Sequence, residues 1–265
     1  MELKSFKSTA EFYSRFRVPY PGGLIAQLEK DANLNNTCVV LDVATGPGRL
    51  ALRLAPIVGK VLAIDIDAEM LREGAAKARA LSLKNVQWVQ ARAESHEIEA
   101  DSVDLVTIGE AIHRLDQDLV LGHIRNWLTS SGCVAIAGCY GILHGSQPWQ
   151  DSLRHAVKRW TSQMRQDDSR RWRGEDHDTA RLMQAGFQDV VNRSFSIPHV
   201  WTRESILGNL HSTSQFSISA LGEQIGDFDK SVMISLEAYE TDQFPQTIPC
   251  GYTIGWKNTQ YGPEI

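Results

Sequence analysis

The sequence predicts an α/β fold, in which a mostly parallel sheet carries helices on both faces. From residue 38 onward, short apolar runs alternate with amphipathic stretches, and a glycine turn follows the first run. The runs are almost continuously apolar, as in strands that are buried on both faces. Strands that alternate with helices at this spacing form βαβ units, whose right-handed crossovers place helices on both sides of the sheet.

Seven segments have the pattern of strands, so we expect a seven-stranded, Rossmann-like sheet. Five of them precede residue 140, and two lie in the less regular C-terminal half. The Ser-Ser-Gly sequence at 130–132 predicts a turn into the fifth strand. The predicted strands are residues 38–43, 61–64, 86–90, 103–108, 133–138, 188–197 and 250–256.

Helical spacing of apolar residues fills the intervals between these strands. Asp67 is placed to cap the helix that follows it, with Glu69 in the first turn. Thr202 has Ser205 at the third following position, which gives only part of a capping box. The polar residues 170–178 predict a loop. Helices are predicted after Asp67 and over residues 49–56, 116–128, 149–164, 179–187 and 201–213, with further helical pieces within 1–36.

Composition and charge exclude several classes of protein. The chain has 265 residues, 42% hydrophobic and 22% charged, which is ordinary for a soluble globular protein. The net charge is −5 with scattered Lys and Arg, which predicts no nucleic-acid partner and no membrane partner. Residues 1–9 lack an apolar core, so we expect no signal peptide and a cytoplasmic protein. The sequence is compatible with a monomer or a homodimer.

The cysteines show no metal-binding pattern. They are Cys38, Cys133, Cys139 and Cys250, with no CxxC spacing and no Cys/His cluster. We therefore expect no metal site and reduced thiols. Because an iron–sulfur centre needs a cysteine cluster, the sequence also argues against radical chemistry.

The candidate functional motif lies at residues 41–51, which read Leu-Asp-Val-Ala-Thr-Gly-Pro-Gly-Arg-Leu-Ala. Gly46 and Gly48 permit a tight turn and close approach of a ligand to the backbone, and the following helix start offers N–H groups. Read from Gly46, the stretch matches the dinucleotide fingerprint G-x-G-x-x-A. The loop therefore predicts a nucleotide-type cofactor.

Asp42 discriminates between cofactors, because a diphosphate beside it would meet a charge of like sign. S-adenosylmethionine carries an ammonium group and no phosphate, so Asp42 favours it. The alternative is that Asp42 hydrogen-bonds the loop backbone. Asp65, 19 residues after Gly46, is placed to accept hydrogen bonds from ribose hydroxyls in either cofactor. Alternatively, Asp65 caps the helix that follows, although Asp67 is better placed for that role.

The order and spacing of these motifs resemble the class I S-adenosylmethionine-dependent methyltransferases. The similar branch acts on small molecules and includes ubiquinone/menaquinone C-methyltransferases and trans-aconitate-type carboxyl methyltransferases. The resemblance covers roughly residues 6–140. The segments that carry it are residues 12–21, 41–48, 63–71, 91–95, 101–116 and 128–138. Two departures are Ala44, where many members have glycine, and His113-Arg114, where the family frequently has His-Trp.

The resemblance implies a set of cofactor contacts. The glycine motif would hold the methionine arm, the second motif the ribose and adenine, and the segment after the fourth strand the methionine end. An N-terminal segment would cover the site, although an ordinary amphipathic helix is the alternative there. The residues implied are Tyr13, Arg17, Tyr20, Asp42, Ala44, Thr45, Gly46, Pro47, Gly48, Asp65, Ile66, Met70, Ala93, Glu94 and Glu110.

His113 is the predicted catalytic base, because it follows the fourth strand and histidine transfers protons near neutral pH. Alternatively, it packs beside the cofactor or orients the substrate. Arg114 is placed to pair with an acidic acceptor, unless it is an exposed helix arginine. The predicted acceptor contacts are Tyr20, His113, Arg114, Trp149 and Trp201. Each tryptophan could instead belong to the core. Trp160 and Trp172 lie in the same half of the chain.

We therefore expect one domain over residues 1–265. It comprises a helical cover (1–36), a cofactor-binding core (37–140), and the rest of the sheet with acceptor-pocket insertions (141–265). The expected activity is methyl transfer to a small molecule, most simply to oxygen, by in-line displacement. One alternative keeps the fold and cofactor in a cyclase or binding module. The other is an NAD(P)-dependent oxidoreductase, against which Asp42 and the lack of a Tyr-x-x-x-Lys pair argue.

Overall fold

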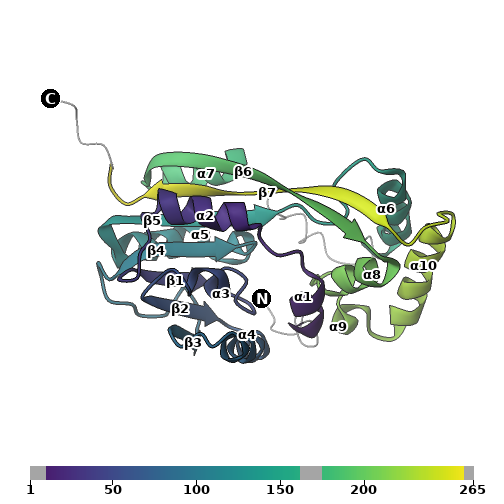
Figure 1. Cartoon of the computed structure of the whole chain (residues 1–265), viewed down its shortest axis with the longest axis horizontal. Helices are drawn as coiled ribbons and strands as arrows, with labels where there is room; N and C mark the ends of the chain where they lie inside the picture. The colour runs from purple at the N-terminus through teal and green to yellow at the C-terminus, as the bar shows by residue number, and fades with distance from the viewer. Residues whose placement is uncertain (1–9, 162–174, 260–265) are drawn as a thin grey trace. The chain divides into compact units, whose positions relative to one another are not determined.

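The computed structural model describes residues 10–161 and 175–259 (Figure 1). The first nine residues, Trp172, the first part of the predicted loop 170–178 and the end of the predicted helix 149–164 lie outside the described residues.

The strands form one seven-stranded sheet in the order β3-β2-β1-β4-β5-β7-β6. The pairings from β3 through β5 are parallel, whereas β5–β7 and β7–β6 are antiparallel. This arrangement confirms the predicted mostly parallel α/β sheet. The strands are β1 Val39–Val43, β2 Lys60–Asp65, β3 Val86–Gln90, β4 Val103–Gly109, β5 Leu128–Cys139, β6 Gln188–Trp201 and β7 Phe244–Trp256.

Helices occupy the intervals between strands, except the fully described interval between β3 and β4, and α2 and α5 lie on opposite faces of the sheet in Figure 1. The α-helices are α1 Ala10–Phe16, α2 Gly22–Asp31, α3 Ala51–Leu54, α4 Ala68–Ala80, α5 Gln117–Trp127, α6 Pro148–Thr161, α7 Glu175–Gln184, α8 Arg203–His211, α9 Ile218–Leu221 and α10 Ile225–Glu237. Two short 3-10 helices are η2 Ile112–Arg114 and η4 Gly222–Gln224.

Three elements differ from the sequence prediction. The Ser-Ser-Gly residues 130–132 lie within β5 rather than in a turn, where the register against β4 is irregular. The predicted loop 170–178 is wrong from residue 175, where α7 begins, since three acidic residues favour a helix N-terminus. The helix predicted over 49–56 is limited to the four residues of α3.

The predicted helix caps are confirmed. The Asp67 carboxylate accepts hydrogen bonds from the backbone N–H groups of Glu69 at 2.8 Å and Met70 at 3.2 Å. Thr202 and Ser205 form a reciprocal capping box at the start of α8. Serine therefore replaces the glutamate of the usual pattern, because its hydroxyl still reaches the Thr202 N–H at 2.7 Å.

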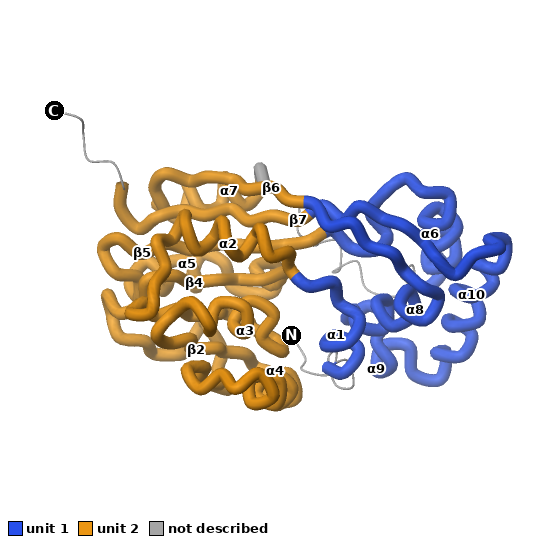
Figure 2. Tube along the Cα trace, viewed as in Figure 1, with its two compact units in different colours: residues 1–19, 140–170, 196–249 blue, residues 20–139, 171–195, 250–265 orange. Residues whose placement is uncertain are grey.

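The chain divides into two compact units, which Figure 2 colours separately. Unit 1 comprises residues 1–19, 140–170 and 196–249, and unit 2 comprises residues 20–139, 171–195 and 250–265. Two of the points at which the chain passes between the units fall inside β6 and β7, so each of these strands contributes residues to both units. The single domain over residues 1–265 remains a prediction.

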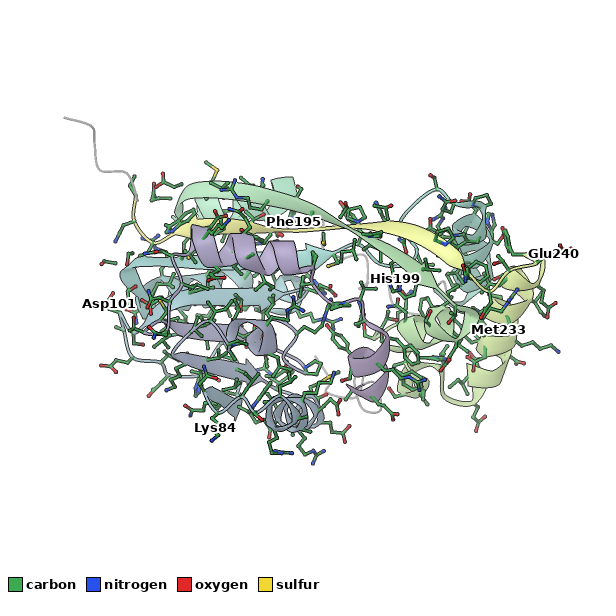
Figure 3. All side chains as sticks on the ribbon, in the orientation of Figure 1. Lys84, Asp101, Phe195, His199, Met233 and Glu240 are labelled. Atoms are coloured by element: carbon green, nitrogen blue, oxygen red, sulfur yellow. The ribbon has the colours of Figure 1, made fainter. Side chains whose placement is uncertain are left out.

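Unit 2 contains the sheet core. On β1 and β4, Leu41 and Val106 point to the face that α5 covers, where they join its Ile124 in one buried cluster. The neighbouring residues alternate to the opposite face. Phe195, labelled in Figure 3, ends the part of β6 that belongs to this unit, and its ring lies 6.3 Å from that of Tyr252 on β7.

Unit 1 has its own aromatic core. The rings of Phe216 and Phe228 stack at 5.1 Å. Helices α1 and α8 cross closely at Gly208, where a Cβ atom would lie 2.3 Å from the Phe16 ring. Glycine is therefore needed for this crossing. None of the helices in the described part of the chain is long and apolar enough to span a membrane.

Candidate functional site

The predicted cofactor residues of unit 2 lie where the parallel strands end. The strands β3, β2, β1 and β4 are neighbours in the sheet and all parallel. Their carboxyl ends therefore share one edge, which is where ligands bind in open α/β sheets. The loop after β1 lies at this edge with the residues that follow β2, β3 and β4.

The loop after β1 turns sharply through left-handed backbone conformations. Ala44, Gly46 and Gly48 have φ of 52°, 56° and 80°. The Thr45 N–H donates to the Ile64 carbonyl at 3.0 Å, which ties the loop to β2. Ala44 thus adopts a left-handed conformation that glycine reaches more easily.

The two glycines of the loop face different surroundings. A Cβ atom on Gly48 would lie 2.5 Å from the Trp88 ring, which also packs against Gly74. A Cβ atom on Gly46 would have no atom within 4 Å. Gly48 is therefore required for packing beneath the loop, whereas Gly46 borders open space from which a ligand could approach the backbone.

Asp42 is buried behind the loop, with 2% of its surface exposed. Its Oδ1 accepts a hydrogen bond from Thr107 Oγ1 at 2.6 Å, and its Oδ2 accepts from Thr45 Oγ1 at 2.5 Å and from the Ala51 N–H at 3.2 Å. Burial raises the pKa of Asp42 to about 6, although these hydrogen bonds oppose the shift. Asp42 therefore organises the loop, as the alternative interpretation expected, and its contact with an ammonium group stays a prediction.

Asp65 ends β2 and bonds the loop from the other side. Its Oδ2 accepts from the Gly46 N–H at 2.7 Å, and its Oδ1 accepts from the Asp67 N–H at 2.9 Å. Burial raises the pKa of Asp65, and these backbone hydrogen bonds partly oppose that shift. The Ile66 N–H also hydrogen-bonds the Asp65 carboxylate. Since a carboxylate has four acceptor positions, three engaged N–H groups leave Asp65 one position for a ribose hydroxyl.

The predicted adenine contacts follow β2 and β3. Ile66 is half-buried, and its carbonyl accepts from Gln90 Nε2 at 3.1 Å. Met70 and Ala93 are buried. Glu94 is half-buried, and its Oε1 accepts from the Asp116 N–H at 3.4 Å. The structure thus brings these residues to the same edge of unit 2 as the loop, while their contact with adenine stays a prediction.

Arg49 joins the loop to the end of β4, and the sequence analysis missed it. Its Nη1 lies 3.0 Å from Oε1 of Glu110, with each side chain 15% exposed. Its guanidinium lies 4.5 Å from the centre of the buried Tyr20 ring. Glu110 itself has a φ of 53°. The only signal in the sequence was an arginine directly after the second glycine of the loop.

Because this ion pair is largely buried, we expect Arg49 and Glu110 to be coupled. In a double-mutant cycle with Arg49→Met and Glu110→Gln, the coupling free energy should be about 1–2 kcal/mol. The measurement is the free energy of unfolding in urea. The exposed pair Arg15–Glu204, with side chains 62% and 68% exposed, is the matched control and should give about 0.5 kcal/mol or less. Equal coupling in the two pairs would contradict this assignment.

His113 and Arg114 lie in η2, three residues beyond β4, and both are half-buried. They belong to unit 2 and follow Glu110 at the same edge of the sheet. This placement agrees with the predicted position of a catalytic histidine. Proton transfer by His113 and acceptor binding by Arg114 stay predictions.

Tyr13 and Arg17 belong to unit 1, which also contains α8. Arg17 Nε donates to Ser212 Oγ at 2.9 Å, and its guanidinium lies 5.0 Å from the Tyr13 ring. Arg17 therefore joins α1 to the end of α8. The cofactor contacts of both residues remain predictions.

Trp149 and Trp201 also belong to unit 1, where both are buried. Trp149 Nε1 donates to the Pro245 carbonyl at 3.3 Å, and Trp201 Nε1 donates to Gln246 Oε1 at 2.8 Å. Each N–H group is thus used inside the unit, which gives both rings a role in its core. Their contact with an acceptor stays a prediction.

We compared the sequence and the structure with those of known proteins. Residues 40–132, which contain the loop, both aspartates and His113, match the methyltransferase domain family. The ubiquinone/menaquinone biosynthesis C-methyltransferase of Escherichia coli is 31% identical over 173 residues, covering 57% of this chain and 66% of that protein. The chain spans 60% to 66% of the length of the curated relatives that it matches.

Solved structures share the fold at lower sequence identity. The YcgJ protein of Bacillus subtilis has a TM-score of 0.59 at 17% identity, covering 90% of this chain and all of that one. Phosphoethanolamine N-methyltransferase 2 of Haemonchus contortus, solved in complex with S-adenosyl-L-methionine, has a TM-score of 0.57 at 17% identity, covering 96% of this chain and 57% of that one. At these identities the likeness concerns the fold.

Proposed function

The chain belongs to the class I S-adenosylmethionine-dependent methyltransferase family, and from this membership we propose that it transfers a methyl group from S-adenosylmethionine to a small molecule. The acceptor that we propose is an oxygen atom of a carboxylate or a hydroxyl group. The observation that carries the proposal is the open side of Gly46, where a Cβ atom would meet nothing within 4 Å, in a loop that the carboxylates of Asp42 and Asp65 hold by hydrogen bonds.

The residues around the loop fit this cofactor. Gly46 leaves room for a ligand against the backbone, and Asp65 has acceptor capacity for a ribose. The carboxylates suit a ligand that carries an ammonium and a sulfonium group and no phosphate. A diphosphate at the loop would instead lie beside the Asp42 carboxylate, whose charge has the same sign, and repulsion between them would be costly.

We propose that the loop and Asp42 hold the methionine arm, that Asp65 holds the ribose, and that Ile66, Met70, Ala93 and Glu94 line the adenine. Glu110 and Tyr20 would border the methionine end, and Tyr13 and Arg17 would cover the site. The cofactor, when bound, supplies a methyl group on a sulfonium, which a nucleophile takes by in-line displacement. The protein aligns that nucleophile and excludes water, and alignment alone can lower a barrier by about 7–11 kcal/mol.

The role of His113 depends on the acceptor. A carboxylate is already a nucleophile and needs no base, whereas a hydroxyl group must lose a proton. His113 would take that proton, Arg114 would pair with an acidic acceptor, and Tyr20, Trp149 and Trp201 would supply aromatic contacts.

His113→Gln separates these cases. With a hydroxyl acceptor, the variant should lose about 10²–10⁴-fold in kcat, because general base catalysis typically contributes that much. With a carboxylate acceptor, kcat should change only a few-fold. The measurement is the steady-state rate with an acceptor of each class, with cofactor affinity as the control. A large loss with a carboxylate acceptor would contradict the assigned role.

Transfer itself is tested with a methyl-labelled cofactor and a panel of hydroxyl and carboxyl compounds. We expect label in the acceptor and formation of S-adenosylhomocysteine. If the cofactor binds and no acceptor in the panel becomes labelled, the result favours a cyclase or a binding module. If the cofactor does not bind at all, the proposal fails at its first step.

A further inference from the structure

Cys139 and Cys250 face each other across the antiparallel pairing of β5 and β7. The Tyr140 N–H donates to the Pro249 carbonyl at 2.9 Å, so the adjacent cysteine pair occupies a non-hydrogen-bonded position. Such positions bring the two Cα atoms to about 4.5 Å, and a disulfide needs about 4.4–6.8 Å. The backbone therefore presents the two cysteines at a spacing that a disulfide can bridge.

The two thiols also contact each other. A hydrogen bond between them raises the pKa of Cys139 and holds the pKa of Cys250 below its usual range. By contrast, Cys133 is buried elsewhere in the sheet, and burial raises its pKa. Cys139 is half-buried and Cys250 is 2% exposed. An oxidant would therefore meet Cys139 first, and Cys250 would be the better nucleophile of the second step.

We infer that Cys139 and Cys250 form a dithiol site that small disulfides such as oxidised glutathione convert to a cross-strand disulfide. In the first step, the Cys139 sulfur attacks the glutathione disulfide, its proton leaves, and one reduced glutathione is released. In the second step, the Cys250 sulfur attacks the mixed disulfide at Cys139, forms the Cys139–Cys250 bond and releases a second reduced glutathione. Two protein thiols are oxidised and one external disulfide is reduced.

The site lies close to the candidate cofactor edge. The Ala137 carbonyl, two residues before Cys139, accepts from the Glu110 N–H at 2.8 Å. The charges of Glu110 and Arg49 both influence the Cys139 thiol. The proposed bond would thus join two strands beside the Arg49–Glu110 pair. The inference stands on the strand register and does not depend on the proposed methyl transfer.

The test incubates the folded protein in buffers of increasing oxidised-to-reduced glutathione ratio, traps free thiols by alkylation and maps peptides without reduction. We expect a Cys139–Cys250 linked peptide that grows with the ratio and disappears after dithiothreitol. The double variant Cys38→Ser/Cys133→Ser should form the same link. In Cys250→Ser, glutathione should remain on Cys139 as a mixed disulfide, because the second nucleophile is missing.

Two results would overturn the inference. One is a wild-type protein that stays folded by circular dichroism and keeps both thiols alkylatable in the most oxidising buffer. The other is a wild-type protein that holds glutathione on Cys139 without forming the link. If Cys250→Ser does not fold, the peptide map of the wild-type protein decides alone.

Discussion

Gly48→Ala should strongly destabilise unit 2, whereas Gly46→Ala should destabilise it less and weaken cofactor binding. The added methyl group on Gly48 would overlap the Trp88 ring at 2.5 Å, and its φ of 80° disfavours any side chain. Overpacking and left-handed strain together should lower the free energy of unfolding by about 2–5 kcal/mol. Urea denaturation followed by tryptophan fluorescence measures this loss.

The same change at Gly46 meets no atom within 4 Å, so only backbone strain of about 1–2 kcal/mol is expected. Its methyl group would stand where we propose the cofactor approaches, and S-adenosylhomocysteine should bind at least about tenfold more weakly, which is about 1.4 kcal/mol. Gly122→Ala, on the exposed side of α5 with open space around it, is the matched control and should bind normally. If Gly46→Ala binds the ligand as well as this control, the loop does not contact it.

Asp42→Asn should increase stability near neutral pH and weaken cofactor binding. The pKa of Asp42 is about 6 in the folded chain against 3.8 as the ordinary value. The folded state therefore binds the proton more tightly, and the wild-type protein loses stability as the pH rises from about 4 to 7. Since about 1.4 kcal/mol corresponds to one pKa unit, the stability advantage of the variant should grow by about 3 kcal/mol over that range.

Binding should change in the opposite direction. If Asp42 faces the ammonium group, its ionised form is favoured by the ligand, and Asp42→Asn should lose about 2–5 kcal/mol of binding free energy. The affinity of the wild-type protein should also rise between pH 5 and 7, while that of the variant should not. Calorimetry at several pH values measures both. An unchanged dissociation constant in the variant would restrict Asp42 to holding the loop.

The sequence predicted the first four strands well because each is a short apolar run, as expected for strands that are buried within a parallel sheet. It missed the start of β5, because residues 130–132 have the composition of a turn although the strand continues through an irregular register. It showed no linker between the two units, because two of their boundaries lie inside the long strands β6 and β7 and another directly follows β5.

At the site, the sequence located Asp42 but not its partners. Thr107 is 65 residues away in the chain and becomes a neighbour only when β1 pairs with β4. Arg49 was missed because nothing in a single arginine indicates the ion pair with Glu110, which forms when β4 ends beside the loop. Local patterns therefore revealed the loop, whereas the contacts that hold it depend on pairing between distant strands.

The most direct test of the central claim is calorimetric titration of the wild-type protein with S-adenosylhomocysteine and, separately, with NAD⁺. The account predicts saturable binding of S-adenosylhomocysteine at one site and no measurable heat from NAD⁺, because the Asp42 carboxylate opposes a diphosphate at the loop. Tight binding of NAD⁺ without binding of S-adenosylhomocysteine would contradict it.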